Sequence, residues 1–112
     1  MRLAMEIYKS FGTSHDFGFR DQICRAAVSV PSNIAEGFER GSDKEFIRFL
    51  RFSLGSAAEL RTQLYLAVKL CKIDTTTGKR LIEGTRVISA QLVGLIRFRS
   101  RNLKKTEKGN GK

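Results

Sequence analysis

The chain contains few of the residues that most often carry catalysis or bind metals. It has one histidine and two cysteines. His15 lies in a stretch of Gly, Thr, Ser and Asp that offers no partners for acid–base or metal chemistry. Cys24 and Cys71 lack the CxxC spacing of zinc sites, and no ExxH pattern supplies di-iron ligands. No glycine-rich phosphate loop precedes a helix. We therefore expect no enzyme, no metal and no cofactor.

Two further absences concern location. No run of about 20 apolar residues is present, so we expect neither a transmembrane helix nor a membrane partner. The first ten residues include Glu6 and lack the apolar segment of a secretory signal peptide. The two cysteines lie in apolar, helical stretches and, without such a signal, are typical of reduced cytosolic thiols. These features predict a cytoplasmic protein.

Positive charge is what the chain has in excess. Lys and Arg number 21 against 11 Asp and Glu, which gives a formal net charge of +10. A balance this basic favours a polyanionic partner, nucleic acid first and an anionic membrane surface second. The membrane is the weaker alternative, because helix packing and subunit contact account better for the apolar faces of the chain.

Apolar residues recur at intervals of three and four, which indicates helices rather than strands. Ser42 and Glu45 have the spacing of a capping box at a helix start. Short connections between the helices predict an all-α, antiparallel, up-down-up-down four-helix bundle, a single domain over residues 1–102. The lysine- and glycine-rich residues 103–112 are predicted to form a basic, disordered tail. The expected helices span residues 1–11, 19–39, 43–72 and 79–102. The first of them places four apolar residues on one face: Leu3, Ile7, Tyr8 and Phe11.

The helix expected over residues 43–72 has two apolar faces. A heptad seam begins at Phe46 and ends at Cys71, and a second line on a neighbouring face includes Phe49 and Phe52. Two such faces are more than a monomeric bundle needs, which favours self-association. Gly55 lowers helix propensity by about 1 kcal/mol in the middle of this helix. We interpret it as a point of close approach to a neighbouring helix.

Residues 25–40 combine a helical pattern with the one proline of the chain, Pro31. The proline removes a backbone donor and predicts a kink. Six polar residues recur at helical intervals there, which predicts one polar stripe. Two interpretations stay open. The hydroxyl and amide groups satisfy backbone groups near the proline inside a core helix, or the stripe faces another subunit or a ligand. The stripe consists of Arg25, Ser29, Ser32, Asn33, Glu36 and Arg40.

The same region carries a resemblance to a known family. The chain resembles, over about residues 17–70, the four-helix-bundle family of proteins encoded in intervening sequences of bacterial large-subunit (23S) ribosomal RNA genes. The resembling stretches are Gln22-Ile23, residues 25–37 with the sequence RAAVSVPSNIAEG, Lys44-Glu45-Phe46, Gly55-Ser56 and Glu59-Leu60.

The resemblance implies a fold and an assembly more than an activity. It implies a four-helix bundle in a ring-like homo-oligomer, with a pentamer as the first expectation. A more distant similarity to the accessory variability protein of diversity-generating retroelements implies a basic pentamer that binds nucleic acid and partners a reverse transcriptase. Structural or interface roles are expected for Arg25, Ser29, Pro31, Ser32, Asn33, Glu36, Gly55 and Glu59.

Basic residues are the candidate binding groups. From residue 97 to the last residue there are seven Lys and Arg against one Glu. Such clusters bind phosphate backbones without sequence preference, although they also serve solubility alone. Arg48 and Arg51 form a second set, beside Lys44 and Arg61. The phenylalanines that alternate with Arg48 and Arg51 suit either base stacking or packing, and we favour packing. The candidate phosphate contacts are Arg97, Arg99, Arg101, Lys104 and Lys105, followed by Arg48 and Arg51.

Two functions follow from these patterns. The first is a non-enzymatic, homo-oligomeric protein that binds nucleic acid, RNA or an RNA–DNA hybrid before DNA, through phosphate contacts. The alternative is a protein–protein scaffold or accessory subunit without direct nucleic-acid binding, in which the polar stripe is an interface.

Overall fold

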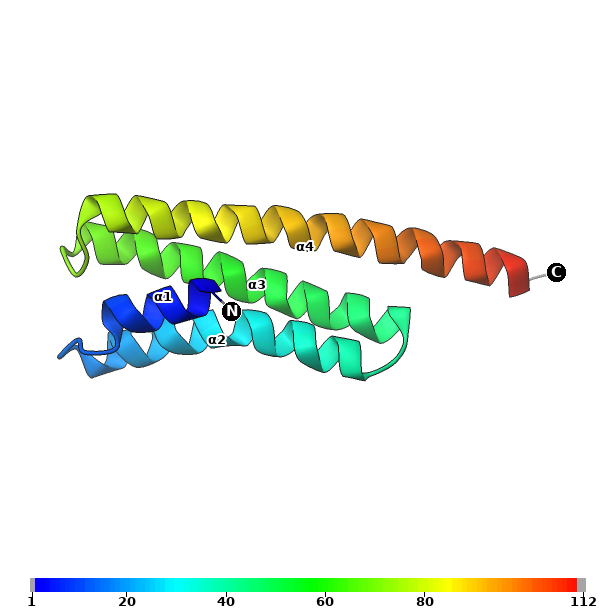
Figure 1. The fold of residues 1–112 in the computed structure, drawn as a ribbon, viewed down its shortest axis with the longest axis horizontal. Coiled ribbons are helices and arrows are strands. Elements are labelled where there is room, and N and C mark those ends of the chain that lie inside the picture. The colour runs from blue at the N-terminus through cyan, green and yellow to red at the C-terminus, as the bar shows by residue number, and fades with distance from the viewer. Residues whose placement is uncertain (1, 111–112) are drawn as a thin grey trace.

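The structure is a computed structural model that describes residues 2–110, with side chains described up to residue 105. Over this part of the chain it is all-helical and has no strand, which confirms the predicted fold class. Each helix runs antiparallel to the next, as Figure 1 shows. The helices are α1 (Arg2–Phe11), α2 (Phe17–Glu39), α3 (Asp43–Lys69) and α4 (Thr75–Asn110).

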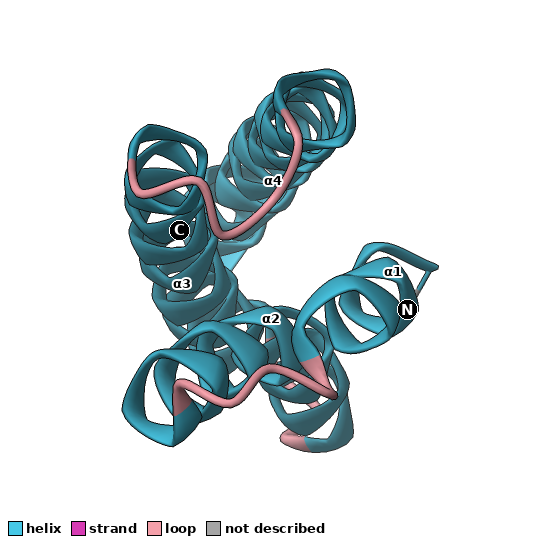
Figure 2. Cartoon of the chain, turned by 90° about the vertical axis from the view of Figure 1, so that its left-hand side faces the viewer, coloured by secondary structure: helices cyan, strands magenta, loops and turns pink. Residues whose placement is uncertain are grey.

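In the described part of the chain, α1 packs along one end of the bundle. Going around it, α1 packs on α2, α2 on α3, α3 on α4, and α4 makes a smaller contact with α1 (Figure 2). Because α1 has 10 residues and α4 has 36, α1 covers only one end. The far end consists of α2, α3 and α4, and α4 projects past the connection between α2 and α3 (Figure 1).

The core divides in the same way. The larger cluster lies at the four-helix end and includes Ile7, Ile23 and Leu60, all with no exposed surface. The smaller cluster consists of Phe46, Leu50 and Leu92, with partly buried Ile34, Leu54, Ile88, Leu95 and Ile96 around it. In α2, α3 and α4, the buried apolar residues therefore recur at the helical intervals predicted from the sequence.

Side-chain caps set three of the helix starts. Ser42 Oγ accepts from the Glu45 amide at 3.2 Å, as the predicted capping box requires. The carboxylate of Asp16 accepts from the backbone of Phe19 at 3.2 Å, which lets α2 begin two residues earlier than expected. Asp74 plays the same part for Thr77 at 2.9 Å, so α4 begins at Thr75 instead of residue 79.

Three expectations about helix ends and burial are wrong. α3 ends at Lys69, and Cys71 lies beyond it, exposed and with a φ of 56°. Tyr8 is 52% exposed, so it is not part of the face that packs on the core. α4 does not end at residue 102 but continues to Asn110, because leucine, lysine and glutamate are good helix formers. The structure thus has residues 103–110 in a helix where the sequence analysis predicted a disordered tail, and residues 111 and 112 lie outside the described residues.

The polar stripe of α2 divides between the interior and the surface. Asn33 Nδ2 donates to the carbonyl of Ser29 at 2.8 Å and to its Oγ at 2.9 Å, and Ser29 Oγ lies 2.7 Å from Ser56 Oγ of α3. Ser53 of α3 donates to the carbonyl of Val30 at 2.8 Å. These bonds surround the proline, and Figure 1 shows the ribbon of α2 changing direction in its cyan middle part. Arg25, Ser32 and Glu36 stay exposed.

α2 and α3 approach each other closely at Gly37, not at Gly55. A Cβ atom on Gly37 would lie 2.6 Å from Phe49 Cβ and 3.1 Å from Phe46 Cδ1, whereas a Cβ on Gly55 would meet no atom within 4 Å. The close approach expected at Gly55 is therefore not found within the described chain, where this glycine faces open space. Glu59, another expected interface residue, is exposed and accepts from Gln63 at 3.4 Å.

Candidate nucleic-acid interface

Four of the seven candidate phosphate contacts come together at the three-helix end. Arg97, Arg101 and Lys104 follow one another at spacings of four and three, which places them on one side of α4. Arg51 reaches the same place from α3. With Ile96 and Ser100, these four side chains line a surface depression of about 340 Å³. A water molecule occupies about 30 Å³ in the liquid, so the depression has room for a phosphate group.

The depression is strongly positive. Among the residues whose side chains the structure describes, none that lines it is acidic. None of the ion pairs found among residues 2–105 involves Arg51, Arg97, Arg101 or Lys104. Among the side chains described, up to residue 105, no carboxylate therefore pairs with these three guanidinium groups and one ammonium group, and all four residues are exposed. Guanidinium groups bind phosphate oxygens with two parallel bonds, and an anion here would offset the repulsion between the cations. We call these four residues the basic cluster.

Arg99 has a different role from its neighbours on α4. Its Nη1 donates to Asp43 Oδ1 at 2.9 Å, and its guanidinium lies 4.9 Å from the ring centroid of Phe46. Both side chains of the ion pair are about one-third exposed. Arg99 thus ties α4 to the first turn of α3 and does not line the depression. Lys105 is exposed but also lies outside the lining.

Arg48 lies near the basic cluster but is paired. Its Nη1 lies 3.3 Å from a carboxylate oxygen of Glu45. Its guanidinium stands over the rings of Phe49 and Phe52, 5.4 and 5.3 Å from their centroids. Phe49 is 9% exposed, which confirms packing for that ring, whereas Phe52 is 46% exposed. The two arginines that the sequence placed on one face of α3 therefore meet different surroundings.

A third basic side chain of α3, Arg61, forms an internal network that the sequence did not indicate. Its Nε donates to Thr85 Oγ1 at 2.9 Å, and its Nη2 donates to the Thr85 carbonyl at 3.3 Å and to Ser89 Oγ at 2.6 Å. Thr85 has no exposed surface. The only signal for this network was a threonine in the apolar seam of α4, at a position where packing alone would favour an aliphatic residue.

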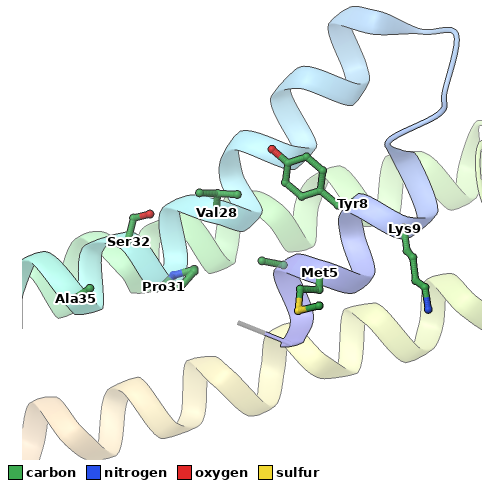
Figure 3. Close-up of a pocket in the computed structure, with 8 residues that line it drawn as sticks. Met5, Tyr8, Lys9, Val28, Pro31, Ser32 and Ala35 are labelled. Atoms are coloured by element: carbon green, nitrogen blue, oxygen red, sulfur yellow. The ribbon is translucent and has the colours of Figure 1, made fainter.

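Sequence analysis also missed an apolar groove between α1 and α2. The groove has a volume of about 670 Å³, and its lining includes Met5 and Tyr8 of α1 with Val28 and Pro31 of α2 (Figure 3). A second depression of about 290 Å³ lies between α2 and α4 and shares Pro31. Tyr8, which the sequence analysis placed on one apolar face with Leu3, Ile7 and Phe11, was the available signal, and Met5 was not singled out.

The perturbed titratable groups lie away from the basic cluster. A hydrogen bond from Lys72, followed by one from the backbone of Phe19, holds the pKa of Asp16 below its usual 3.8. The backbone amide and hydroxyl of Thr77 lower the pKa of Asp74 in the same way. Burial raises the pKa of the Cys24 thiol, which disfavours the reactive thiolate. Within residues 2–110, no group of three or more His, Cys, Asp or Glu is arranged to hold a metal ion.

The fold and the cluster define a basic, all-helical, antiparallel bundle protein. Comparison with known families then identifies it: the chain belongs to the 23S rRNA-intervening sequence protein family, whose model matches residues 1–94. The basic cluster extends past the matched residues, since only Arg51 of its four members lies within them. In the described part of the chain, no helix combines the length and apolarity needed to cross a membrane.

A solved structure supports the same fold. The crystal structure, at 1.70 Å resolution, of a protein with unknown function from the S23 ribosomal protein family of Bacteroides thetaiotaomicron is similar to this chain, with a TM-score of 0.79 and 25% sequence identity. The similarity covers 85% of this chain and 92% of that one. No curated protein matches the chain.

Proposed function

We propose that this protein is a non-enzymatic nucleic-acid-binding protein that holds backbone phosphates at the basic cluster. The observation that carries the proposal is the convergence of four cations from two helices around one depression, with no carboxylate among the described side chains that line it. Phosphate contacts of this kind give affinity without sequence preference. Because the family description names an intervening sequence of 23S rRNA, RNA is the first nucleic acid to test, ahead of an RNA–DNA hybrid and DNA.

Four phosphate contacts imply a defined dependence on salt. For single strands the slope of log K against log salt is about −0.7 per phosphate contact, so four contacts give a slope of about −2.8. Between 50 and 200 mM salt the affinity should then fall roughly 50-fold. A titration of fluorescent structured RNA, single-stranded DNA and duplex DNA, at both salt concentrations, measures this slope for each class.

A charge-matched pair of variants tests the location. Arg97→Gln with Arg101→Gln removes two charges from the cluster and should reduce the slope to about −1.4. Lys69→Gln with Lys79→Gln removes two exposed charges from the opposite end of the bundle and should leave the slope near −2.8. An equal loss in both variants would mean that net charge, not the cluster, governs binding.

The second candidate function is a protein–protein scaffold that assembles with itself. The apolar groove between α1 and α2 favours it, since exposed apolar surface of this kind marks interaction sites.

We expect a homo-oligomer, with the pentamer as the leading stoichiometry, and a cytoplasmic location. A reverse transcriptase is a further partner to test. Light scattering coupled to gel filtration gives the subunit number, and Asn33→Ala and Glu36→Ala test the polar stripe by a change in mass at unchanged helicity.

A further inference from the structure

We propose that the protein prefers single-stranded nucleic acid because one of its bases stacks on the exposed ring of Phe52 while the neighbouring phosphates occupy the basic cluster. This inference rests on the proposed function and extends it by naming the form of nucleic acid. Phe52 lies on the outer face of α3, beside Arg51, and is 46% exposed. Faces of this kind attract bases because base–aromatic stacking is favourable for every base.

The ring of Phe52 is held in place before any ligand arrives. It meets the buried Phe49 at a centroid distance of 5.4 Å and an interplanar angle of 78°. The guanidinium of Arg48 lies 5.3 Å from its centroid, and Glu45 holds that arginine at 3.3 Å. A fixed ring loses little conformational freedom when a base stacks on it, so more of the stacking free energy appears as affinity.

The arginines around Phe52 suit stacking better than phosphate binding. Arg48 pairs with Glu45, and Arg40 pairs with Glu36 at 2.9 Å while its guanidinium stands 5.1 Å from the centroid of Phe49. Each pair is close to neutral, so it adds little to the field that attracts phosphates. The arginines instead present planar guanidinium groups, and unpaired bases stack on such groups as they do on aromatic rings. This surface therefore complements the basic cluster rather than enlarging it.

The two surfaces adjoin on α3. Arg48 and Arg51 are three residues apart, so their Cβ atoms are neighbours about 5–6 Å apart. The Arg48 guanidinium lies 5.3 Å from the centroid of the half-exposed Phe52 ring, and Arg51 lines the depression with Arg97 and Arg101. A strand whose phosphates lie in the depression would thus have its bases beside Phe52. In a duplex the bases stack on one another and are not available to the ring, which is why the preference is for single strands.

The test compares two substitutions that remove an exposed ring but keep an apolar side chain. Phe52→Leu removes the proposed stacking face. Phe17→Leu is the control, because Phe17 is 59% exposed and lies under Arg20 at 4.8 Å, but it belongs to the start of α2 at the other end of the bundle. Both full-length variants are titrated with a fluorescent 12-nucleotide oligouridine and with a 12-base-pair RNA duplex, and circular dichroism verifies the helicity of each.

We expect Phe52→Leu to weaken oligouridine binding roughly 5- to 140-fold, which corresponds to the usual 1–3 kcal/mol of one stacked base. The salt slope and the duplex affinity should not change, because no charge is removed. Phe17→Leu should leave both affinities unchanged, and Phe52→Tyr should restore oligouridine binding. A 2-aminopurine placed in the strand should lose fluorescence on binding to the original protein and keep it with Phe52→Leu.

Several results would overturn the inference. They are an oligouridine affinity of Phe52→Leu within twofold of the original, an equal loss for the duplex, or an equal loss in Phe17→Leu. A change of subunit number in Phe52→Leu with unchanged binding would assign the ring to self-association instead. If Phe52→Leu does not fold, the 2-aminopurine signal with the original protein still decides, because fluorescence that binding leaves unchanged overturns the inference. Failure of the proposed function is distinct, since the original protein would then bind neither probe with the expected salt slope.

Discussion

Replacing Gly37 with alanine should destabilise the protein, although alanine is the better helix former. The substitution gains about 1 kcal/mol of helix propensity. Against this, the new Cβ would lie 2.6 Å from Phe49 Cβ, about 1 Å closer than ordinary contact, and 3.1 Å from the ring of Phe46. Phe49 cannot rotate its Cβ away, so α2 and α3 must move apart along the part of the bundle that only three helices form.

Overpacking of this kind costs about 1–3 kcal/mol, and the loosened contact adds the lost packing of the two phenylalanines. We therefore expect a net loss of about 1–2 kcal/mol. Gly55→Ala is the matched control, because a Cβ there meets no atom within 4 Å, and it should stabilise the protein by about 0.5–1 kcal/mol. Urea unfolding followed by circular dichroism measures both free energies of unfolding. Equal stabilisation by the two alanines would refute the close approach at Gly37.

Three further predictions concern individual contacts. Arg61→Met should lower the free energy of unfolding by about 2–3 kcal/mol, because it leaves the buried Thr85 and the half-buried Ser89 of α4 without their donor. Urea unfolding measures this loss, and an unchanged stability would contradict the network. Arg99→Gln should destabilise the protein by about 1 kcal/mol, because it breaks the partly buried ion pair with Asp43. The salt slope of RNA binding should not change, and a reduced slope would mean that Arg99 contacts phosphate. The lowered pKa of Asp16 contributes stability that is fully present above pH 3.8 and is lost as the pH falls through the lower pKa of the folded protein. Asp16→Asn should therefore make the stability depend less on pH between those two limits, as measured by acid unfolding. An unchanged acid transition would argue against the hydrogen bond from Lys72.

The fold class was predictable because it depends on the spacing of apolar residues, which can be read directly from the sequence. The seams of α2, α3 and α4 and the cap at Ser42 require only spacing and residue type. Helix ends were less predictable. Lys104 and Lys105 read as part of a polar tail in a linear sequence, yet they are good helix formers and simply continue α4.

The site was predictable in its residues but not in their partners. Sequence shows where the cations are, but Arg99 meets Asp43 from 56 positions away, so its pairing depends on how α3 and α4 are aligned. The same alignment brings Arg51 to Arg97 and Arg101. For glycine the limit is similar: Gly37 and Gly55 look alike in a helical pattern, and only the packing of α2 against α3 shows which of them needs to lack a side chain.

The unequal size of the two core clusters has a consequence for how the molecule opens. Backbone amides at the four-helix end lie over the larger core cluster, so they should exchange with deuterium only when the whole bundle unfolds. Amides around Leu50 and Leu92 lie over a smaller cluster that α1 does not cover, and they should exchange through partial openings of lower free energy. Since the basic cluster lies at the end with the smaller core cluster, ligand binding should slow deuterium exchange there first. The ligand would then stabilise the end of the bundle that has the smaller core.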